Sequence, residues 1–296
     1  MADLCLAVDI GGTKLAAGLV SRTGALQAAE HVPTAGDAPG GAEELFGRLA
    51  ALVARVRGAA QGTVVVCGVG CGGPMAPDGA AVSPLNIAAW RDFPLRDRLA
   101  QLTGLPTAVD NDAKALALGE WWRGAGRGHR DFVAMVVSTG IGGGIVLDGR
   151  LLDGRLGNAG HIGHVVVEPD GRPCSCGGFG CLEAEASGTA IAARTGRPAA
   201  EASPAEVERS GRLVGRAVAS VANLLDLPLA VVSGSVALGF GEPFFAAAQA
   251  GLSRHARIEF ARGAVIVPGA LGQDGPLIGA GAVGWRLVDG VAPGAA

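Results

Sequence analysis

Apolar residues in the first half of the chain form short runs of strand length that alternate with longer stretches of helical spacing. The short runs predict strands at residues 4–9, 15–20, 25–32, 63–69 and 107–109. Residues 43–57 predict an amphipathic helix, because apolar side chains recur there every three or four positions. Two further helices are predicted at residues 95–102 and 112–121. Strands that alternate with helices indicate an α/β fold with mixed sheets.

The second half of the chain repeats the opening pattern. A predicted strand at residues 132–138 is followed by a glycine-rich turn at 139–144 and a returning apolar run at 145–147. The first strand, its glycine turn and the run at 15–20 have the same order, and this weak internal repeat indicates two related lobes. The remaining predicted elements are helices at 212–225 and 277–287 and strands at 229–232 and 265–267.

Composition and charge exclude several classes of protein. The 24 basic and 27 acidic residues give a net charge of −3 without a basic stripe, so nucleic acid is not expected as a partner. No apolar run reaches the roughly 18 residues that a membrane-spanning helix needs. The N-terminus shows no secretory leader, so we expect a cytoplasmic protein without a membrane partner. The 50 glycines gather in clusters after apolar runs, which is typical of turns that approach phosphates.

The first glycine turn has the residue types of a phosphate-binding loop. Backbone N–H groups at Gly11 and Gly12 can approach phosphate oxygens closely, and Thr13 and Lys14 add further donors. Asp9 ends the preceding strand, where its carboxylate would face the Mg²⁺ that accompanies ATP. An ordinary hairpin turn is the alternative for this segment taken alone.

Two later clusters have similar chemistry. The second turn offers Thr139, Gly140, Gly142 and Gly143 as phosphate contacts. A third cluster, Gly234 and Ser235, follows the predicted strand at 229–232 and is a weaker candidate for the wall of an adenosine pocket.

Three of the six cysteines lie within eight residues of one another and near a histidine. Their spacing supplies one imidazole and three thiolates, a complete tetrahedral set for structural Zn²⁺, from His164, Cys174, Cys176 and Cys181. A set of reduced thiols in a flexible loop is the alternative. The other three cysteines lie in apolar runs and are expected to be reduced core residues.

With these three loops in this order, the chain resembles the actin-like ROK family (repressors, open reading frames, kinases) over nearly its whole length. The most specific match is the stretch 157–164, Gly-Asn-Ala-Gly-His-Ile-Gly-His, followed by the cysteine loop that ends in Cys181-Leu-Glu183. The resemblance implies two ribonuclease-H-like lobes with ATP and a sugar bound between them. It also implies a homodimer or homotetramer.

The expected lobes are divided near residues 113–119, and no linker marks the boundary. The N-terminal lobe would comprise residues 1–115 and 275–296 with the first phosphate hairpin. The C-terminal lobe, residues 116–274, would hold the second phosphate loop, the zinc loop and the oligomer interface.

The resemblance also assigns roles to residues of the sugar site. Asp112 matches the catalytic base that accepts a proton from a sugar hydroxyl, although an acid at a helix start is more often only an N-cap. The implied sugar contacts are Gly73, Asn86, Asn111, Asp112, His161, His164 and Glu183. For Asn86, a plain turn residue is the alternative.

Position 161 bears on the choice of sugar. Glucose kinases of the family usually have glutamate there, whereas His161 is similar to bacterial N-acetylmannosamine kinases. A neutral imidazole can make one hydrogen bond and pack its flat face against an acetamido group. We therefore expect ATP-dependent phosphorylation of N-acetylmannosamine at its 6-hydroxyl, a step of sialic-acid breakdown, with glucokinase as the alternative. A sugar-responsive repressor is less expected, because the hairpin begins within four residues of Met1. A histidine that bonds only to the zinc loop is the alternative reading of position 161.

Overall fold

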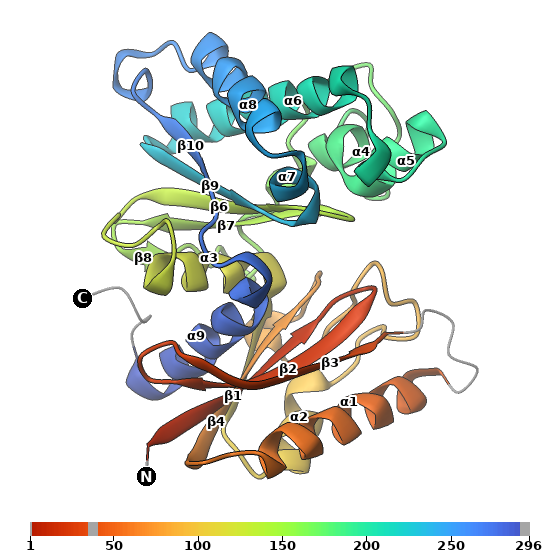
Figure 1. Ribbon diagram of the computed structural model, residues 1–296, viewed down its shortest axis with the longest axis vertical. Coiled ribbons are helices and arrows are strands. Elements are labelled where there is room, and N and C mark those ends of the chain that lie inside the picture. The colour runs from red at the N-terminus through yellow and green to blue at the C-terminus, as the bar shows by residue number, and fades with distance from the viewer. Residues whose placement is uncertain (1, 35–40, 291–296) are drawn as a thin grey trace. The chain divides into compact units, whose positions relative to one another are not determined.

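The computed structural model describes residues 2–34 and 41–290 (Figure 1). The chain divides into two compact units that are each built from separate stretches of sequence. Unit 1 comprises residues 1–128, 150–159 and 273–296, and unit 2 comprises residues 129–149 and 160–272. The boundary expected near residue 115 falls inside helix α3 (Asp112–Arg123), which belongs as a whole to unit 1.

The core of unit 1 is a mixed sheet with the strand order β3-β2-β1-β4-β5. Its strands are β1 (Asp3–Ile10), β2 (Lys14–Ser21), β3 (Leu26–Pro33), β4 (Thr63–Cys71) and β5 (Thr107–Asn111). The first three strands are antiparallel neighbours, whereas β4 and β5 run parallel to β1. The carboxyl ends of β1, β4 and β5 therefore lie along the same edge of the sheet.

The alternation of side chains along β1 divides the core of unit 1 between two faces. Leu4, Leu6, Val8 and Ile10 belong to one large cluster that includes the buried face of α1 (Gly41–Gly58) and residues of α2 (Leu95–Thr103). Ala7 packs with residues of α9 (Gly275–Asp289) in a cluster on the other face. Figure 1 shows α1 and α2 on one side of this sheet and α9 on the other.

Glycines permit α9 to pack very close to the sheet. A Cβ atom on Gly68 of β4 would lie 2.0 Å from the carbonyl oxygen of Ala280 and 2.4 Å from the nitrogen of Gly284, both in α9. A Cβ on Gly279 would lie 2.4 Å from the carbonyl oxygen of Ala115 in α3. Because these neighbours are backbone atoms that cannot rotate away, small residues are required where β4, α3 and α9 meet.

Unit 2 repeats the topology of unit 1. Its sheet has the order β10-β9-β6-β7-β8, with β6 (Phe132–Val137), β7 (Ile141–Leu147), β8 (Arg150–Leu151), β9 (Leu229–Ser233) and β10 (Val265–Pro268). As β1 does in unit 1, β6 pairs with an antiparallel hairpin partner on one side and with a parallel strand on the other. The internal repeat predicted from the sequence is therefore confirmed at the level of strand order and direction.

The helices of unit 2 are α4 (Leu182–Ala186), α5 (Gly188–Thr195), α6 (Pro204–Leu225), α7 (Ser235–Phe240) and α8 (Glu242–His255). Sequence patterning predicted only the second half of α6. Helices α6 and α8 lie side by side (Figure 1), and a Cβ on Gly215 of α6 would lie 2.0 Å from the carbonyl oxygen of Ala248 in α8. Short 3₁₀ helices lie at Pro77–Gly79, Ile162–His164, Ala199–Glu201, Glu259–Ala261 and Gly272–Asp274.

The second glycine turn is shorter than predicted. Gly142, Gly143 and Gly144 are residues of β7, where they pair with Val136, Met135 and Ala134 of β6. A Cβ on Gly143 would lie 3.1 Å from the carbonyl oxygen of Gly160, so close packing accounts for glycine at that position. Only residues 138–140 form the turn between the two strands.

None of the helices within residues 2–34 and 41–290 has both the length and the apolar character needed to span a membrane.

Candidate functional site

Two acidic residues of unit 1 come together at the carboxyl edge of its sheet. Asp9 of β1 pairs in register with Gly70 of β4, and Gly70 pairs with Asp110 of β5. Asp112 follows directly as the first residue of α3. The parallel arrangement of β1, β4 and β5 thus brings the end of the first strand beside the strand-to-helix turn that carries Asp112.

Gly70 leaves open the space between these two acids. A Cβ atom at this position would lie 3.5 Å from the Cα of Asp112 and 3.6 Å from Oδ1 of Asp9. A Cβ would be in ordinary van der Waals contact with both residues, so Gly70 marks the place where Asp9 and the start of α3 come together. Gly70 was not among the predicted site residues, since a single glycine inside a strand carries no distinctive pattern.

The close approach of the two acids disturbs the ionisation of Asp9. Burial raises its pKa, the negative charge of Asp112 raises it further, and nearby Lys14 opposes the rise, which leaves the pKa of Asp9 at about 7. A carboxylate whose pKa is raised by burial and by a neighbouring negative charge can bind a cation strongly. Asp9 is therefore the residue of unit 1 best placed to hold Mg²⁺.

The first glycine turn connects β1 to β2 beside Asp9. The turn is closed by the Gly11 N–H, which donates to the carbonyl oxygen of Lys14 at 3.0 Å. Thr34 stabilises it from outside, since its hydroxyl donates to the Gly11 carbonyl at 2.7 Å and its N–H donates to the Thr13 carbonyl at 3.0 Å. A Cβ on Gly12 would lie 2.7 Å from the Cβ of Asn86, so the predicted sugar contact Asn86 lies directly against this turn.

The other predicted residues of unit 1 lie on the same edge. Asn111 caps α3, because its amide oxygen accepts from the N–H groups of Ala113 at 3.0 Å and Lys114 at 3.4 Å. Capping uses the oxygen, so a sugar hydroxyl would be bound by the amide nitrogen. The carbonyl oxygen of Gly73 accepts from Leu85 N–H at 3.3 Å, which connects Gly73 to the loop that carries Asn86.

In unit 2, residues from α4 and α5 bind the second glycine turn. Oε2 of Glu183 accepts from the N–H of Ile141 at 2.8 Å. The Gly188 N–H donates to the Ser138 carbonyl at 2.7 Å, and the Thr189 hydroxyl donates to the Thr139 carbonyl at 2.9 Å. These bonds fix the backbone of the turn that contains Thr139 and Gly140. Glu183, predicted as a sugar contact, thus uses one carboxylate oxygen to hold this turn and has Oε1 to offer a ligand.

The third glycine cluster lies beside the second turn. Gly234 has φ 102° and precedes α7, and a Cβ at this position would lie 2.3 Å from the carbonyl oxygen of Val137 at the end of β6. The hydroxyls of Ser235 and Ser138 lie 2.9 Å apart. Ser235 therefore lies beside Ser138, in the turn that also contains Thr139. The two segments must lie this close together if both are to contact one nucleotide.

The four predicted zinc ligands form one cluster in unit 2. The candidate ligand atoms of His164, Cys174, Cys176 and Cys181 all lie within 4.8 Å of one another. Tetrahedral Zn²⁺ with Zn–S of about 2.3 Å and Zn–N of about 2.0 Å places ligand atoms about 3.8 Å (S···S) and 3.6 Å (S···N) apart. Cys176 Sγ lies 3.7 Å from Cys181 Sγ, and Cys174 Sγ lies 3.6 Å from His164 Nδ1. Both the donor set and the spacing fit structural zinc.

His161 lies next to this cluster. Its ring centroid is 5.9 Å from that of His164, and its side chain is exposed. His164 was expected to serve both metal and sugar, and the structure places its Nδ1 among the thiols. An exposed imidazole at position 161 can reach a ligand, while its neighbour is committed to the cluster.

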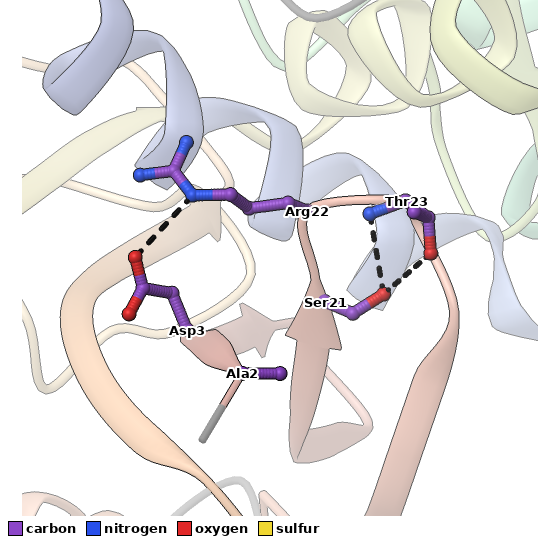
Figure 2. Close-up of a pocket in the computed structure, with 5 residues that line it drawn as sticks. All are labelled: Ala2, Asp3, Ser21, Arg22 and Thr23. Carbon is purple, nitrogen blue, oxygen red and sulfur yellow. Dashed lines mark hydrogen bonds and ion pairs between the residues drawn. The ribbon is translucent and has the colours of Figure 1, made fainter.

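A surface pocket of about 410 Å³ lies at the other end of β1 and β2 from the first glycine turn (Figure 2). Its lining residues, Ala2, Asp3, Ser21, Arg22 and Thr23, come from the start of β1 and the end of β2, opposite to the glycine turn. Within it, Arg22 Nε donates to Asp3 Oδ2 at 3.4 Å. This pocket contains no predicted site residue and is not part of the candidate site.

Replacing Asp9 tests the strain on its ionisation. The folded protein binds more protons than the unfolded chain between about pH 4 and 7, so ionisation of Asp9 lowers the stability of the protein as the pH rises through that window. Without nucleotide, Asp9→Asn should have a higher free energy of unfolding than the unchanged protein. We expect this gain to be about 2 kcal/mol larger at pH 8 than at pH 5. Urea unfolding followed by tryptophan fluorescence measures this, because all four tryptophans lie in unit 1.

Asp3→Asn is the matched control for Asp9→Asn, since Asp3 begins the same strand with a half-exposed carboxylate. A gain in stability for Asp9→Asn that does not change with pH would contradict the raised pKa.

Removal of one thiol tests the zinc site. Cys176→Ser should reduce bound zinc from about one ion per chain to a small fraction, because three donors hold structural zinc weakly. Elemental analysis of the purified protein measures the metal content. Cys67→Ala removes a buried thiol outside the cluster and should leave the zinc content unchanged. Equal zinc content in both variants would show that the cluster does not bind the metal.

Comparisons with known proteins agree with this arrangement. The ROK family model matches residues 5–285 of the chain. N-acetylmannosamine kinase of Escherichia fergusonii is 40% identical over 255 residues, covering 80% of this chain and 84% of that protein. Glucokinase of Halalkalibacterium halodurans is 34% identical, covering 93% of this chain and 92% of that protein. The crystal structure of a ROK family glucokinase from Streptomyces griseus, in complex with glucose and AMPPNP, has a TM-score of 0.82 and 32% identity, covering 96% of this chain and 99% of that one. The chain therefore belongs to the ROK family.

Proposed function

We propose that this protein is an ATP-dependent sugar kinase that phosphorylates the 6-hydroxyl of a hexose, with N-acetylmannosamine as the favoured substrate. The observation that carries the proposal is the meeting of Asp9 and Asp112 at Gly70, beside a glycine turn that presents backbone N–H groups. One acid to hold the metal of a nucleotide and a second to accept a proton are what phosphoryl transfer to an alcohol requires.

Asp112 acts as the general base in this proposal. As the sugar oxygen attacks the γ-phosphorus, its O–H proton passes to the Asp112 carboxylate, the new O–P bond forms, and the bond to the β-γ bridging oxygen breaks to release ADP. The carboxylate belongs to the first residue of α3, directly after the N-cap Asn111. Because the transition state is loose, most of the rate comes from positioning the two substrates in line.

Asp9 and the first turn bind the phosphate end of the nucleotide. Bound Mg²⁺ neutralises charge on the phosphate oxygens, and Asp9 is the residue that would hold it. The N–H group of Gly12, together with Thr13 and Lys14, would complete the anion site, while the Gly11 N–H closes the turn by donating to the Lys14 carbonyl. The glycine at position 12 also leaves room for Asn86, so that a sugar contact and a phosphate contact share this corner of unit 1.

The second turn and the third glycine cluster bind the rest of the nucleotide. Thr139 and Gly140 would contact phosphate, while Gly234 and Ser235 would line the adenosine pocket. Two sets of hydrogen bonds support this role. The hydroxyls of Ser138 and Ser235 bond to each other. The Glu183 carboxylate, the Gly188 N–H and the Thr189 hydroxyl bond to backbone groups of the turn and of Ile141, so that the two segments form one rigid surface. Gly142 and Gly143 serve this surface through the packing of β7.

The histidine at position 161 favours N-acetylmannosamine over glucose. The relatives of this chain include kinases named for each sugar, so overall similarity does not separate them. An exposed imidazole beside the cysteine cluster offers one hydrogen bond and a flat apolar face, which suits an acetamido group better than a carboxylate does. Glucokinase is the second candidate function, supported by the likeness to the glucose-bound Streptomyces griseus enzyme.

Structural zinc, a cytoplasmic location and a homodimer or homotetramer complete the proposal. Zinc would serve the site indirectly, because Cys181 immediately precedes α4, the helix that carries Glu183. The acids at positions 9 and 112 favour a kinase over a sugar-responsive regulator, which has no use for a general base.

Asp112→Asn tests the base. We expect kcat to fall by roughly 10²–10⁴-fold while the KM for the sugar stays within a few-fold, since an amide keeps the shape of the side chain and loses its basicity. Asp97→Asn is the matched control, because Asp97 is an exposed acid in the first turn of α2. This variant should have the kcat of the unchanged protein. Turnover by Asp112→Asn at the level of that control would remove Asp112 from the role of base.

ADP release with N-acetylmannosamine, glucose and N-acetylglucosamine in parallel tests the substrate. We expect the highest kcat/KM with N-acetylmannosamine. His161→Glu should shift the ratio toward glucose by about tenfold or more, because the carboxylate can bind two adjacent hydroxyls. A higher kcat/KM with glucose for the unchanged protein would make the second candidate function correct.

A further inference from the structure

Helix α3 carries a fully buried lysine two residues after Asp112. Lys114 is 1% exposed, and its Nζ atom lies 2.9 Å from Asp110 Oδ1, 2.8 Å from Asp153 Oδ1 and 3.1 Å from the carbonyl oxygen of Gly157. An ammonium group has three protons, and these three acceptors match them. Lys114 therefore connects the end of β5 to a segment about forty residues further along the chain.

Arg286 of α9 extends this contact into a network of alternating charge. Its Nη2 atom lies 2.9 Å from Asp153 Oδ2, and its Nη1 atom lies 3.9 Å from Asp110 Oδ2. Two cations and two carboxylates thus surround the point where β5, α3 and α9 meet. Lys114 and Asp110 are largely buried, whereas Asp153 and Arg286 are partly exposed. A buried ion pair gives little net stability compared with apolar packing of the same volume, so the Lys114–Asp110 pair favours a role in placing groups.

The charges depend on one another. Burial raises the pKa of Asp110, and the charge of Lys114 opposes that rise. Partial burial acts in the same direction on Asp153, but Arg286 and Lys114 outweigh it and lower the pKa of that carboxyl. Removal of Lys114 would leave both carboxylates with the Arg286 guanidinium alone, which lies 2.9 Å from Asp153 but 3.9 Å from Asp110.

The segment that Lys114 binds is an insertion into unit 1. The chain leaves unit 2 after Gly149 and returns to it at Gly160, and residues 150–159 belong to unit 1, although the first two of them form β8, the edge strand of the second sheet. A second anchor holds this segment near the sugar contacts. The Asn158 side chain accepts from Met75 N–H at 3.4 Å and donates to the Met75 carbonyl at 3.2 Å, two residues after Gly73.

Lys114 also acts on the turn that carries the proposed base. The Asp110 oxygen that it binds accepts from the N–H of Asn111 at 2.8 Å, and Asn111 caps the helix that begins with Asp112. One ammonium group therefore fixes both the strand-to-helix turn at residues 110–112 and the inserted segment.

We propose that Lys114 is a positioning residue that fastens the inserted segment 150–159 to the turn at residues 110–112 and so sets the sugar-binding geometry around Asp112. The kinetic part of this inference rests on the proposed sugar kinase function. The attachment of the segment does not, and can be tested without any substrate.

Limited trypsin digestion tests the attachment. Arg155 is an exposed residue of the segment, between Asp153 and Gly157. In Lys114→Met and in Asp153→Asn, cleavage after Arg155 should be at least tenfold faster than in the unchanged protein, as measured by mass spectrometry of the fragments. The matched control is Arg212→Met, which removes a cation from an exposed ion pair with Glu208 on α6. Cleavage after Arg155 at the rate of the unchanged protein in folded Asp153→Asn would overturn the proposal.

Steady-state kinetics of the same variants test the positioning. We expect kcat/KM for the sugar to fall at least tenfold while the KM for ATP stays within twofold, a division that general loss of stability would not produce. The double variant Lys114→Met/Asp153→Asn should lose less than the sum of the two single losses, because both single changes break the Lys114–Asp153 contact. Additive losses, or equal losses toward both substrates, would refute the positioning role.

The trypsin and kinetic experiments distinguish failure of the Lys114 proposal from failure of the proposed kinase function. If the unchanged protein phosphorylated none of the sugars, the proposed function would fail, while the trypsin result would still decide whether Lys114 fastens the segment. Asp153 is about half exposed, so Asp153→Asn carries the test if the buried change Lys114→Met prevents folding.

Discussion

The burial of Asp9 beside Asp112, at the carboxyl edge of its sheet, is the constraint on which the candidate site of unit 1 depends. Three parallel strand ends in register bring the two acids together, and Gly70 leaves the space between them open. Burial and the neighbouring negative charge raise the pKa of Asp9 to about 7, which costs stability at neutral pH. A cation bound beside this pair would offset that cost.

Close backbone packing between β4, α3 and α9 fixes the edge of the sheet that carries Asp9 and Asp112. The glycines of β4 and α9 permit the helix to lie against the sheet at backbone distance, and α3, with its first residue Asp112, packs against α9 in the same way through Gly279. The charges of Lys114, Asp153 and Arg286 then connect α3, α9 and the inserted segment. In unit 2, Glu183 has a comparable role, since it connects the helix after the last cysteine to the second glycine turn.

Local patterns predicted much of this architecture. Every predicted strand is present, with ends that differ by a few residues, except that the run expected at 145–147 begins at Ile141. That difference arises because Gly142–Gly144 have the composition of a turn, yet they are strand residues, and the missing side chain of Gly143 admits Gly160 and Ile162. Helices α4, α5, α7 and α8 were not predicted, because their short or alanine-rich sequences carry little periodicity.

The sequence by itself determined the elements that depend on near neighbours: the β1–β2 hairpin with its glycine turn, the helix start at Asp112, and a cluster of one histidine and three cysteines within 18 residues that could hold a metal ion. Tertiary structure alone decided which distant residues share a site. Lys114 and Asp153 are 39 residues apart, and Ile141 and Glu183 are 42 apart, so neither contact has a spacing that a pattern could show. Strand register and the packing of α9 create these contacts, because they join stretches of chain whose separation in sequence says nothing of their distance in space.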